Sequence, residues 1–126
     1  MRRVAVLLAG LVLAACSSTP TAQDLPAGIL SARPDITAEE AEFVLAAEDL
    51  GVSVTAQSVA DDIEIGTTTC WALKTGGLTL GEIARDSQGA PLPNSGAGLR
   101  TKQLMYAAVR TLCPDYDSQL DQLDLP

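Results

Sequence analysis

Apolar side chains recur at intervals of three or four residues in several stretches of this chain, which is typical of one face of an α-helix. The clearest stretch covers residues 38–50. It begins within Thr37-Ala38-Glu39-Glu40, which has the spacing of a capping box, and Gly51 stands where a helix commonly ends. The pattern therefore predicts a first helix over residues 38–50.

A second helix is predicted from residue 59 to the Gly76-Gly77 pair. Its apolar face steps by four, three, four and three residues through Val59, Ile63, Gly66, Cys70 and Leu73. A glycine inside a helix costs about 1 kcal/mol relative to alanine, so we expect another helix to approach closely at Gly66. A kink or a ligand contact there is the alternative. The same spacing directs Cys70 towards the core.

The remaining helices are separated by a segment rich in helix breakers. Thr79 and Glu82 repeat the capping-box spacing and predict a helix of barely two turns. Glycine, proline and small polar residues dominate residues 87–98, where we expect a mobile surface loop. Residues 99–112 are again amphipathic, and Pro114 follows their end. Since no run alternates apolar and polar residues for long, the chain is predicted to be all-α, a small bundle of about four helices.

The N-terminal residues have the pattern of an export signal. Two arginines precede an apolar run over residues 4–13, which is shorter than the roughly 20 residues that span a bilayer. Leu13-Ala14-Ala15-Cys16 matches the lipobox of bacterial lipoprotein precursors, in which the cysteine thiol receives diacylglycerol and becomes the new N-terminus. We therefore expect lipidation at Cys16, where several acyl chains anchor far more strongly than one. A signal peptide with a chance cysteine is the alternative.

These patterns divide the chain into four parts. Residues 1–15 are expected to be a signal peptide that is removed, and residues 16–35 a lipidated cysteine with a flexible tether. Residues 36–116 are the predicted helical domain. Residues 117–126 are an acidic tail, either a final amphipathic turn or disordered. We expect the exported protein to be held by its lipid on the outer face of the plasma membrane, in the cell envelope.

Cysteine usage predicts one disulfide. If Cys16 carries the lipid, Cys70 and Cys113 remain as an even pair, and a disulfide is the default in an oxidising compartment. It would join the second helix to the end of the last one. Such a bond leaves no thiolate for catalysis or metal binding.

The acidic balance excludes one class of partner. The chain carries eight Lys and Arg residues against sixteen Asp and Glu residues, a net charge of −8, and it contains no histidine. Loss of Arg2 and Arg3 with the signal peptide would leave six basic residues and a net charge of −10. Because binding to phosphates needs a basic face, we expect no nucleic-acid partner.

Carboxylates are the abundant titratable groups. They form two clusters, Glu39, Glu40 and Glu42, and then Asp61, Asp62 and Glu64. Neither cluster has the spacing around a central glycine that marks a calcium loop, so we expect both on solvated helix faces. The lack of histidine also removes the commonest general base and zinc ligand. The sequence therefore predicts no enzyme, no catalytic residues, no metal and no cofactor.

Two aromatic residues are candidate partner contacts. Trp71 follows Cys70 and lies off the main apolar face, and Tyr106 lies one position from the apolar face of its own helix. One interpretation places them at the edge of the core or over the disulfide. The other makes them exposed aromatic anchors for a partner.

Three segments together resemble the domain of unknown function 732 family. They are FVLAAEDLGV at residues 43–52, GTTTCWALKTG at 66–76, and Ala107-Ala108 followed by CPDY at 113–116. The family consists of small secreted proteins and lipoproteins of mycobacteria and related actinobacteria, some carried by phages. The resemblance implies a compact helical domain with a Cys70 to Cys113 disulfide, and it implies no activity. Leu112, where an aromatic residue is usual, and a longer loop at 87–98 depart from the family pattern.

Three functions are compatible with these features. The anchor, the tether and the missing catalytic residues favour a non-enzymatic binding module that contacts an envelope protein. The occurrence of the family in phages suggests an alternative, a phage or prophage lipoprotein that blocks superinfection by engaging a phage protein. The alanine-rich faces of residues 38–50 and 99–112 suggest another, a carrier that holds a small apolar molecule between helices.

Overall fold

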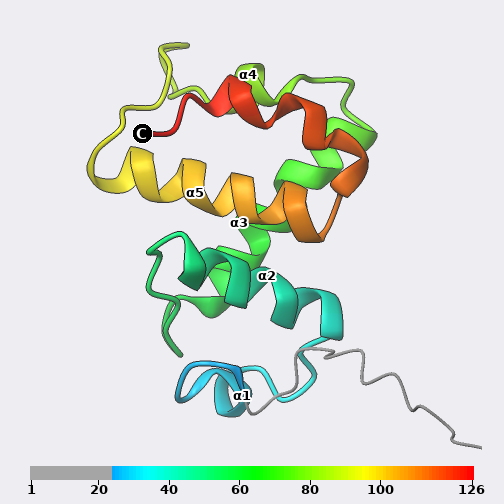
Figure 1. Ribbon diagram of the computed structural model, residues 1–126, viewed down its shortest axis with the longest axis vertical. Helices are drawn as coiled ribbons and strands as arrows, with labels where there is room; N and C mark the ends of the chain where they lie inside the picture. The colour runs from blue at the N-terminus through cyan, green and yellow to red at the C-terminus, as the bar shows by residue number, and fades with distance from the viewer. Residues whose placement is uncertain (1–23) are drawn as a thin grey trace, which may run out of the picture.

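The computed structural model describes residues 24–126 (Figure 1). Its elements in chain order are α1 (Ile29–Ala32), α2 (Ala38–Asp49), α3 (Val59–Lys74), α4 (Leu80–Ile83), α5 (Gly96–Thr111) and the 3-10 helix η2 (Pro114–Leu123). These residues form no strand, only an isolated bridge between Arg85 and Pro91. The all-α prediction is confirmed. None of the helices in this range has the length and apolar content that crossing a bilayer requires. The predictions for the signal peptide and Cys16 fall outside the described residues.

Helix α5 lies at the centre of the domain. Figure 1 shows α1, α2, α5 and η2 stacked along the long axis of the molecule, with α3 running across the stack behind them. Helix α5 packs against α2, α3 and η2, and η2 also packs against α4. The core is therefore built around the buried faces of α2, α3 and α5, which are the three long helices predicted from the sequence.

The two capping-box patterns differ in outcome. At α4 the box is complete, because the Thr79 hydroxyl accepts from the Glu82 N–H and the Glu82 carboxylate accepts from the Thr79 N–H at 2.8 Å. This backbone hydrogen bond, helped by the Thr79 side chain, holds the pKa of Glu82 below its ordinary value. At α2 the Thr37 hydroxyl accepts from the Glu40 N–H, but the Glu40 carboxylate binds Arg33 at 3.1 Å instead.

The predicted close approach at Gly66 is confirmed. Phe43 of α2 is completely buried, and its ring lies against the Gly66 backbone of α3. A Cβ atom at position 66 would lie 3.0 Å from Phe43 Cε2 and 3.3 Å from Leu112 Cδ1. Contacts below about 3.4 Å force a neighbour to move, so the glycine admits the ring at the junction of α2 and α3. Gly66 therefore allows the close packing of a neighbouring helix, which was the first of the two interpretations of this residue.

The predicted disulfide is present. Cys70 of α3 and Cys113, which follows α5, are joined with their Cα atoms 5.7 Å apart, and both are buried. The bond links residues 43 positions apart. It therefore ties the middle of the chain to the end of the central helix.

The packed part of the chain begins before Ile36, where the sequence had placed its start. Ile29 of α1 is completely buried in the core, and Leu25 packs partly against it. The predicted tether over residues 16–35 contains the helix breakers Pro26, Gly28 and Pro34, but these residues flank a single helical turn. Gly28 precedes that turn with a φ of +84°, which glycine adopts without strain. The described part of the predicted tether thus belongs to the domain.

The C-terminal residues belong to the domain as well. Leu123 of η2 is 1% exposed and lies in the core. The side chains of Gln119 and Gln122 accept hydrogen bonds from the backbone N–H groups of Leu80 and Gly81, at 2.8 and 2.9 Å. The first N–H groups of a helix have no partner within it, so these glutamines complete the start of α4. Of the two alternatives for the tail, the amphipathic one is confirmed, and the tail is not a separate part of the chain.

The predicted loop over residues 87–98 is shorter than expected, because α5 begins at Gly96. The Asp86 carboxylate accepts the N–H groups of Gln88 and Ala90 and closes a turn. The Asn94 side chain donates to the Asp124 carbonyl at 2.9 Å and accepts from the buried Lys102 ammonium. Hydrogen bonds therefore connect both ends of the loop to the folded domain.

Candidate binding site

A groove of about 420 Å³ lies between α3 and α5, and α4 borders it. We call it the α3–α5 groove. Its lining residues are Asp61, Glu64, Ile65, Thr68, Thr69, Ala72, Ile83, Thr101 and Met105. A volume of this size lies within the range of ligand-binding clefts, roughly 300 to 1,000 Å³.

The surface of the α3–α5 groove is mainly apolar. Met105, Ala72 and Thr69 are nearly buried, and the partly exposed Ile65 and Ile83 complete the apolar lining. The Thr69 hydroxyl donates to the Ile65 carbonyl at 2.7 Å, so its hydrogen-bonding capacity is used within α3. Water in such a groove forms few hydrogen bonds with the protein, and an apolar group that replaces it gains binding free energy.

Carboxylates occupy one edge of the groove. Asp61 and Glu64 are exposed, lie one helical turn apart on α3, and form no ion pair within residues 24–126. No Lys or Arg lines the groove. No group of His, Cys, Asp and Glu residues in the described range is arranged to hold a metal ion. The edge therefore carries a negative charge that the rest of the domain leaves open to a partner.

Asp62 differs from its neighbours and corrects the prediction of a solvated cluster. It is 1% exposed, and its two carboxylate oxygens bind the Arg100 guanidinium at 2.6 and 2.8 Å. Ser58 donates to the same carboxylate, and Arg100 also donates to the Ser53 carbonyl. The hydrogen bonds to Asp62 raise the pKa of Arg100 above its ordinary value. This bidentate pair joins α3 to α5 beside the groove, and its charges cancel.

Trp71 lies on the exposed face of α3. Its side chain is 62% exposed, whereas the preceding Cys70 is buried. On an α-helix, residues 64, 68 and 71 follow one another along one side, so Trp71 continues the edge that carries Glu64 and Thr68. The exposure counts against the interpretation that places Trp71 at the edge of the core or over the disulfide. It fits the partner-contact hypothesis, which stays a prediction.

Tyr106 lies on another side of the domain. It is half-buried and borders a smaller hollow of about 250 Å³ between α2 and α5, together with Leu50 and Arg110. Met105, its neighbour in sequence, faces the α3–α5 groove instead. The structure therefore separates the two aromatic candidates, and only Trp71 lies next to the groove edge.

The sequence did not identify the groove itself. Its lining comes from α3, α4 and α5, and the helical pattern on each element alone does not show that their faces meet. One local signal was available. Ile65 is an apolar residue that lies off the core-facing stripe of α3, between Glu64 and Gly66.

These features define a small all-helical domain that is closed by one disulfide and carries an apolar groove with an acidic edge. The family model described as "Protein of unknown function (DUF732)" matches residues 38–115, which is more than half of the chain, and the protein belongs to this family. The matched residues include both disulfide cysteines and the whole lining of the groove. Neither the curated proteins nor the solved structures contain a significant match.

Proposed function

We propose that this protein is a lipid-anchored envelope protein whose helical domain is a non-enzymatic binding module. The observation that carries the proposal is Trp71, which is 62% exposed on α3 and follows the groove-lining residues Glu64 and Thr68 along one side of that helix. Tryptophan is enriched among the residues that dominate binding free energies, because it buries a large area with few rotatable bonds. An exposed tryptophan beside an apolar groove is thus typical of a surface that binds another protein.

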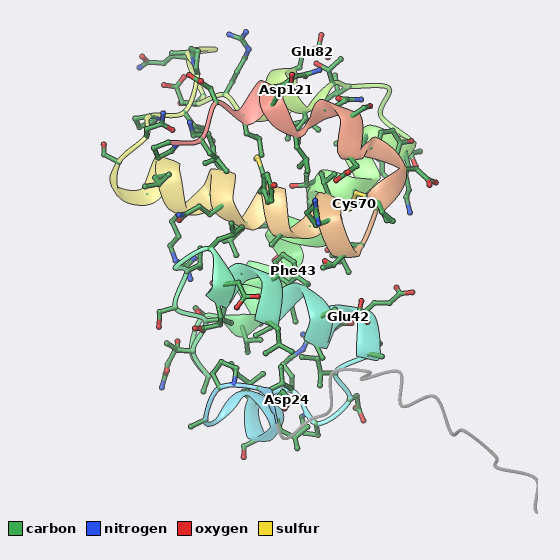
Figure 2. All side chains as sticks on the ribbon, viewed as in Figure 1. Asp24, Glu42, Phe43, Cys70, Glu82 and Asp121 are labelled. Carbon is green, nitrogen blue, oxygen red and sulfur yellow. A yellow bond between two sulfur atoms is a disulfide. The ribbon has the colours of Figure 1, made fainter. Side chains whose placement is uncertain are left out.

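The N-terminal sequence supports the anchor. Cys16 ends a lipobox, and the seven residues between it and Asp24 reach at most roughly 25 Å when extended. Figure 2 shows Asp24 and Cys70 in opposite halves of the molecule along its long axis. Trp71 is the residue next to Cys70, so the end of the groove edge that carries Trp71 lies away from the end where the tether joins. A partner in the envelope space can therefore reach this surface while the lipid stays in the membrane.

The groove volume also favours a second candidate, the carrier of a small apolar ligand. Its position differs from the expected one, because the lining comes from α3, α4 and α5 and not from the alanine-rich faces of α2 and α5. The groove is partly open to solvent, whereas a carrier site usually encloses most of its ligand. We therefore place the binding of a partner protein first.

The proposal is tested by crosslinking in intact host cells, with capture of the full-length protein. We expect the native chain to enrich a partner from the membrane fraction, and Trp71→Ala to reduce that enrichment at least fivefold. Mass spectrometry of the membrane-bound native chain is expected to show an acylated Cys16 as its N-terminal residue.

Two results would contradict the proposal. Equal capture by the native chain and Trp71→Ala would show that this face is not the binding surface. Absence of an acyl group on Cys16 in the membrane-bound native chain would show that Cys16 does not carry the anchor. If a small molecule co-purifies with the native chain and is lost when groove residues are substituted, the carrier hypothesis would replace the hypothesis of a binding module.

A further inference from the structure

We infer that the α3–α5 groove receives a basic amphipathic helix of a partner protein, with apolar side chains on the groove floor and Lys or Arg against Asp61 and Glu64. This inference rests on the proposed function and specifies the chemistry of the partner. It combines three properties of the groove, namely its length, its lining and its uncompensated charge.

The length of the groove favours a helix over a compact ligand. The α3 residues that line it extend from Asp61 to Ala72, which corresponds to roughly 16 Å along the helix axis. This distance accommodates about three turns of a second helix. A helix in an open apolar groove presents residues i, i+4 and i+7 to the floor and keeps its other side in solvent, a recurrent mode of peptide recognition.

The lining selects apolar side chains. Ile65, Ala72, Ile83 and Met105 supply hydrocarbon surface along the groove. Methionine adapts its shape to different partners because its side chain is unbranched and flexible. The threonine beside them has its hydroxyl bonded to the Ile65 carbonyl, so it offers no competing polar contact. Leucine, isoleucine or methionine side chains at helical spacing fit this floor.

The negative charge at the groove edge favours basic residues on the flank of the partner helix. Asp61 and Glu64 lie on one edge, and the nearby Arg100 is neutralised by its bidentate pair with Asp62. A Lys or Arg on the partner therefore meets two carboxylates without an opposing cation in the groove lining. The net charge of −8 acts in the same direction and increases the rate of encounter with a basic segment.

Trp71 extends the contact along the same edge. It lies two helical turns after Glu64, and an exposed indole both covers apolar groups and binds Lys or Arg over its face. The edge therefore offers two carboxylates and one aromatic ring to a single basic helix. Trp71 is also the only tryptophan of the chain, so its fluorescence reports directly on occupation of the groove.

The test uses the chain from residue 16 onward with Cys16→Ser, which removes the lipid and the need for detergent. The probe is a 14-residue helical peptide without tryptophan, with leucines at i, i+4 and i+7 and lysines on one flank. We expect saturable binding with a blue shift of Trp71 emission. Glutamates in place of the lysines should weaken binding at least tenfold, and a scrambled peptide of the same composition should also bind at least tenfold more weakly.

Matched variants on α3 separate the groove from general charge. Thr68 lines the groove and is exposed, whereas Thr67 is exposed beside it but does not line the groove. Thr68→Arg is expected to weaken peptide binding at least twentyfold. Thr67→Arg makes the same change of charge on the side of α3 between Glu64 and Trp71 but outside the groove lining, and it is expected to weaken binding several-fold less than Thr68→Arg. The Asp61→Asn/Glu64→Gln double variant should weaken it about tenfold. Circular dichroism establishes that each variant retains its helices.

Three results would overturn the inference. They are absence of peptide binding, equal weakening by Thr67→Arg and Thr68→Arg, and equal binding of the lysine and glutamate peptides. Tighter groove-dependent binding of decyltrimethylammonium below its micelle concentration would instead assign the groove to a small cationic amphiphile. If the chain does not bind the peptide but captures a partner in cells that depends on Trp71, this inference is wrong and the proposed function is still supported.

Discussion

Removal of the Cys70 to Cys113 disulfide is expected to lower the free energy of unfolding by about 4 kcal/mol. The bond closes a loop of 43 positions, and its loss returns chain entropy to the unfolded state. Native domains of this size have only about 5 to 15 kcal/mol in total, so the change is large. The measurement is urea unfolding, followed by circular dichroism, of Cys70→Ala/Cys113→Ala against the native pair.

Alanine is the appropriate replacement because both positions are buried and serine would add unpaired hydroxyls there. Both proteins carry Cys16→Ser, so the comparison isolates one bond. Treatment of the native pair with a reductant provides the control, since it breaks the same bond without a change of sequence. A loss below 1 kcal/mol in both experiments would show that the disulfide contributes little to this fold.

Truncation of the aromatic side chain at the α2–α3 junction is expected to have a similar effect. Phe43→Ala should lower the free energy of unfolding by about 3 to 5 kcal/mol, because Phe43 is completely buried and its loss leaves a cavity. Phe43→Leu retains much of the volume and should cost about 1 kcal/mol. The measurement is the urea unfolding midpoint and slope of each variant.

A double-mutant cycle with Gly66→Ala tests the contact behind this prediction. In the native chain the new methyl group meets the Phe43 ring at 3.0 Å, so Gly66→Ala should be destabilising despite the better helix propensity of alanine. In the Phe43→Ala background the same methyl group enters the cavity and should stabilise the protein by about 1 kcal/mol. Additive effects would show that the ring and the glycine do not depend on each other.

The helices could be predicted because their signals are local. The apolar spacing of Val59, Ile63, Cys70 and Leu73 records which side of α3 is buried, and Gly66 marks where a neighbour approaches. The disulfide followed from the count of cysteines and the expected compartment. The helical fold, the disulfide and the family are therefore confirmed, whereas the lipid anchor and the function remain proposals.

The boundaries of the domain could not be predicted in the same way. Ile29 and Leu123 lie in short segments near Gly28, Pro34 and several acids, where the local sequence indicates a tether and a tail. Their burial depends on tertiary packing with elements far along the chain. The hydrogen bonds from the start of α4 to Gln119 and Gln122 span 39 and 41 positions, and no local pattern encodes such a pairing.

The candidate site could also be predicted only in part, because it too depends on contacts between distant parts of the chain. Asp62 belongs to a run of acids that indicates solvent exposure, and its burial follows from Arg100, 38 positions away. Trp71 was identified as a candidate because a lone tryptophan off the apolar stripe is locally unusual, but its exposure required the structure. The groove depends on three helices together, so only its individual residues, and not its shape, were accessible from the sequence.

The central claim is that the groove face of α3 binds a partner while the protein is anchored in the envelope. Site-specific crosslinking in intact cells tests it most directly, with a photoreactive phenylalanine analogue in place of Trp71 or, as a control, in place of Leu30. Leu30 is also an exposed apolar residue, 44% exposed, and it lies on α1 at the tether end. We predict a discrete partner adduct from position 71 and none from position 30. An adduct from position 30 alone, or none from position 71, would contradict the account.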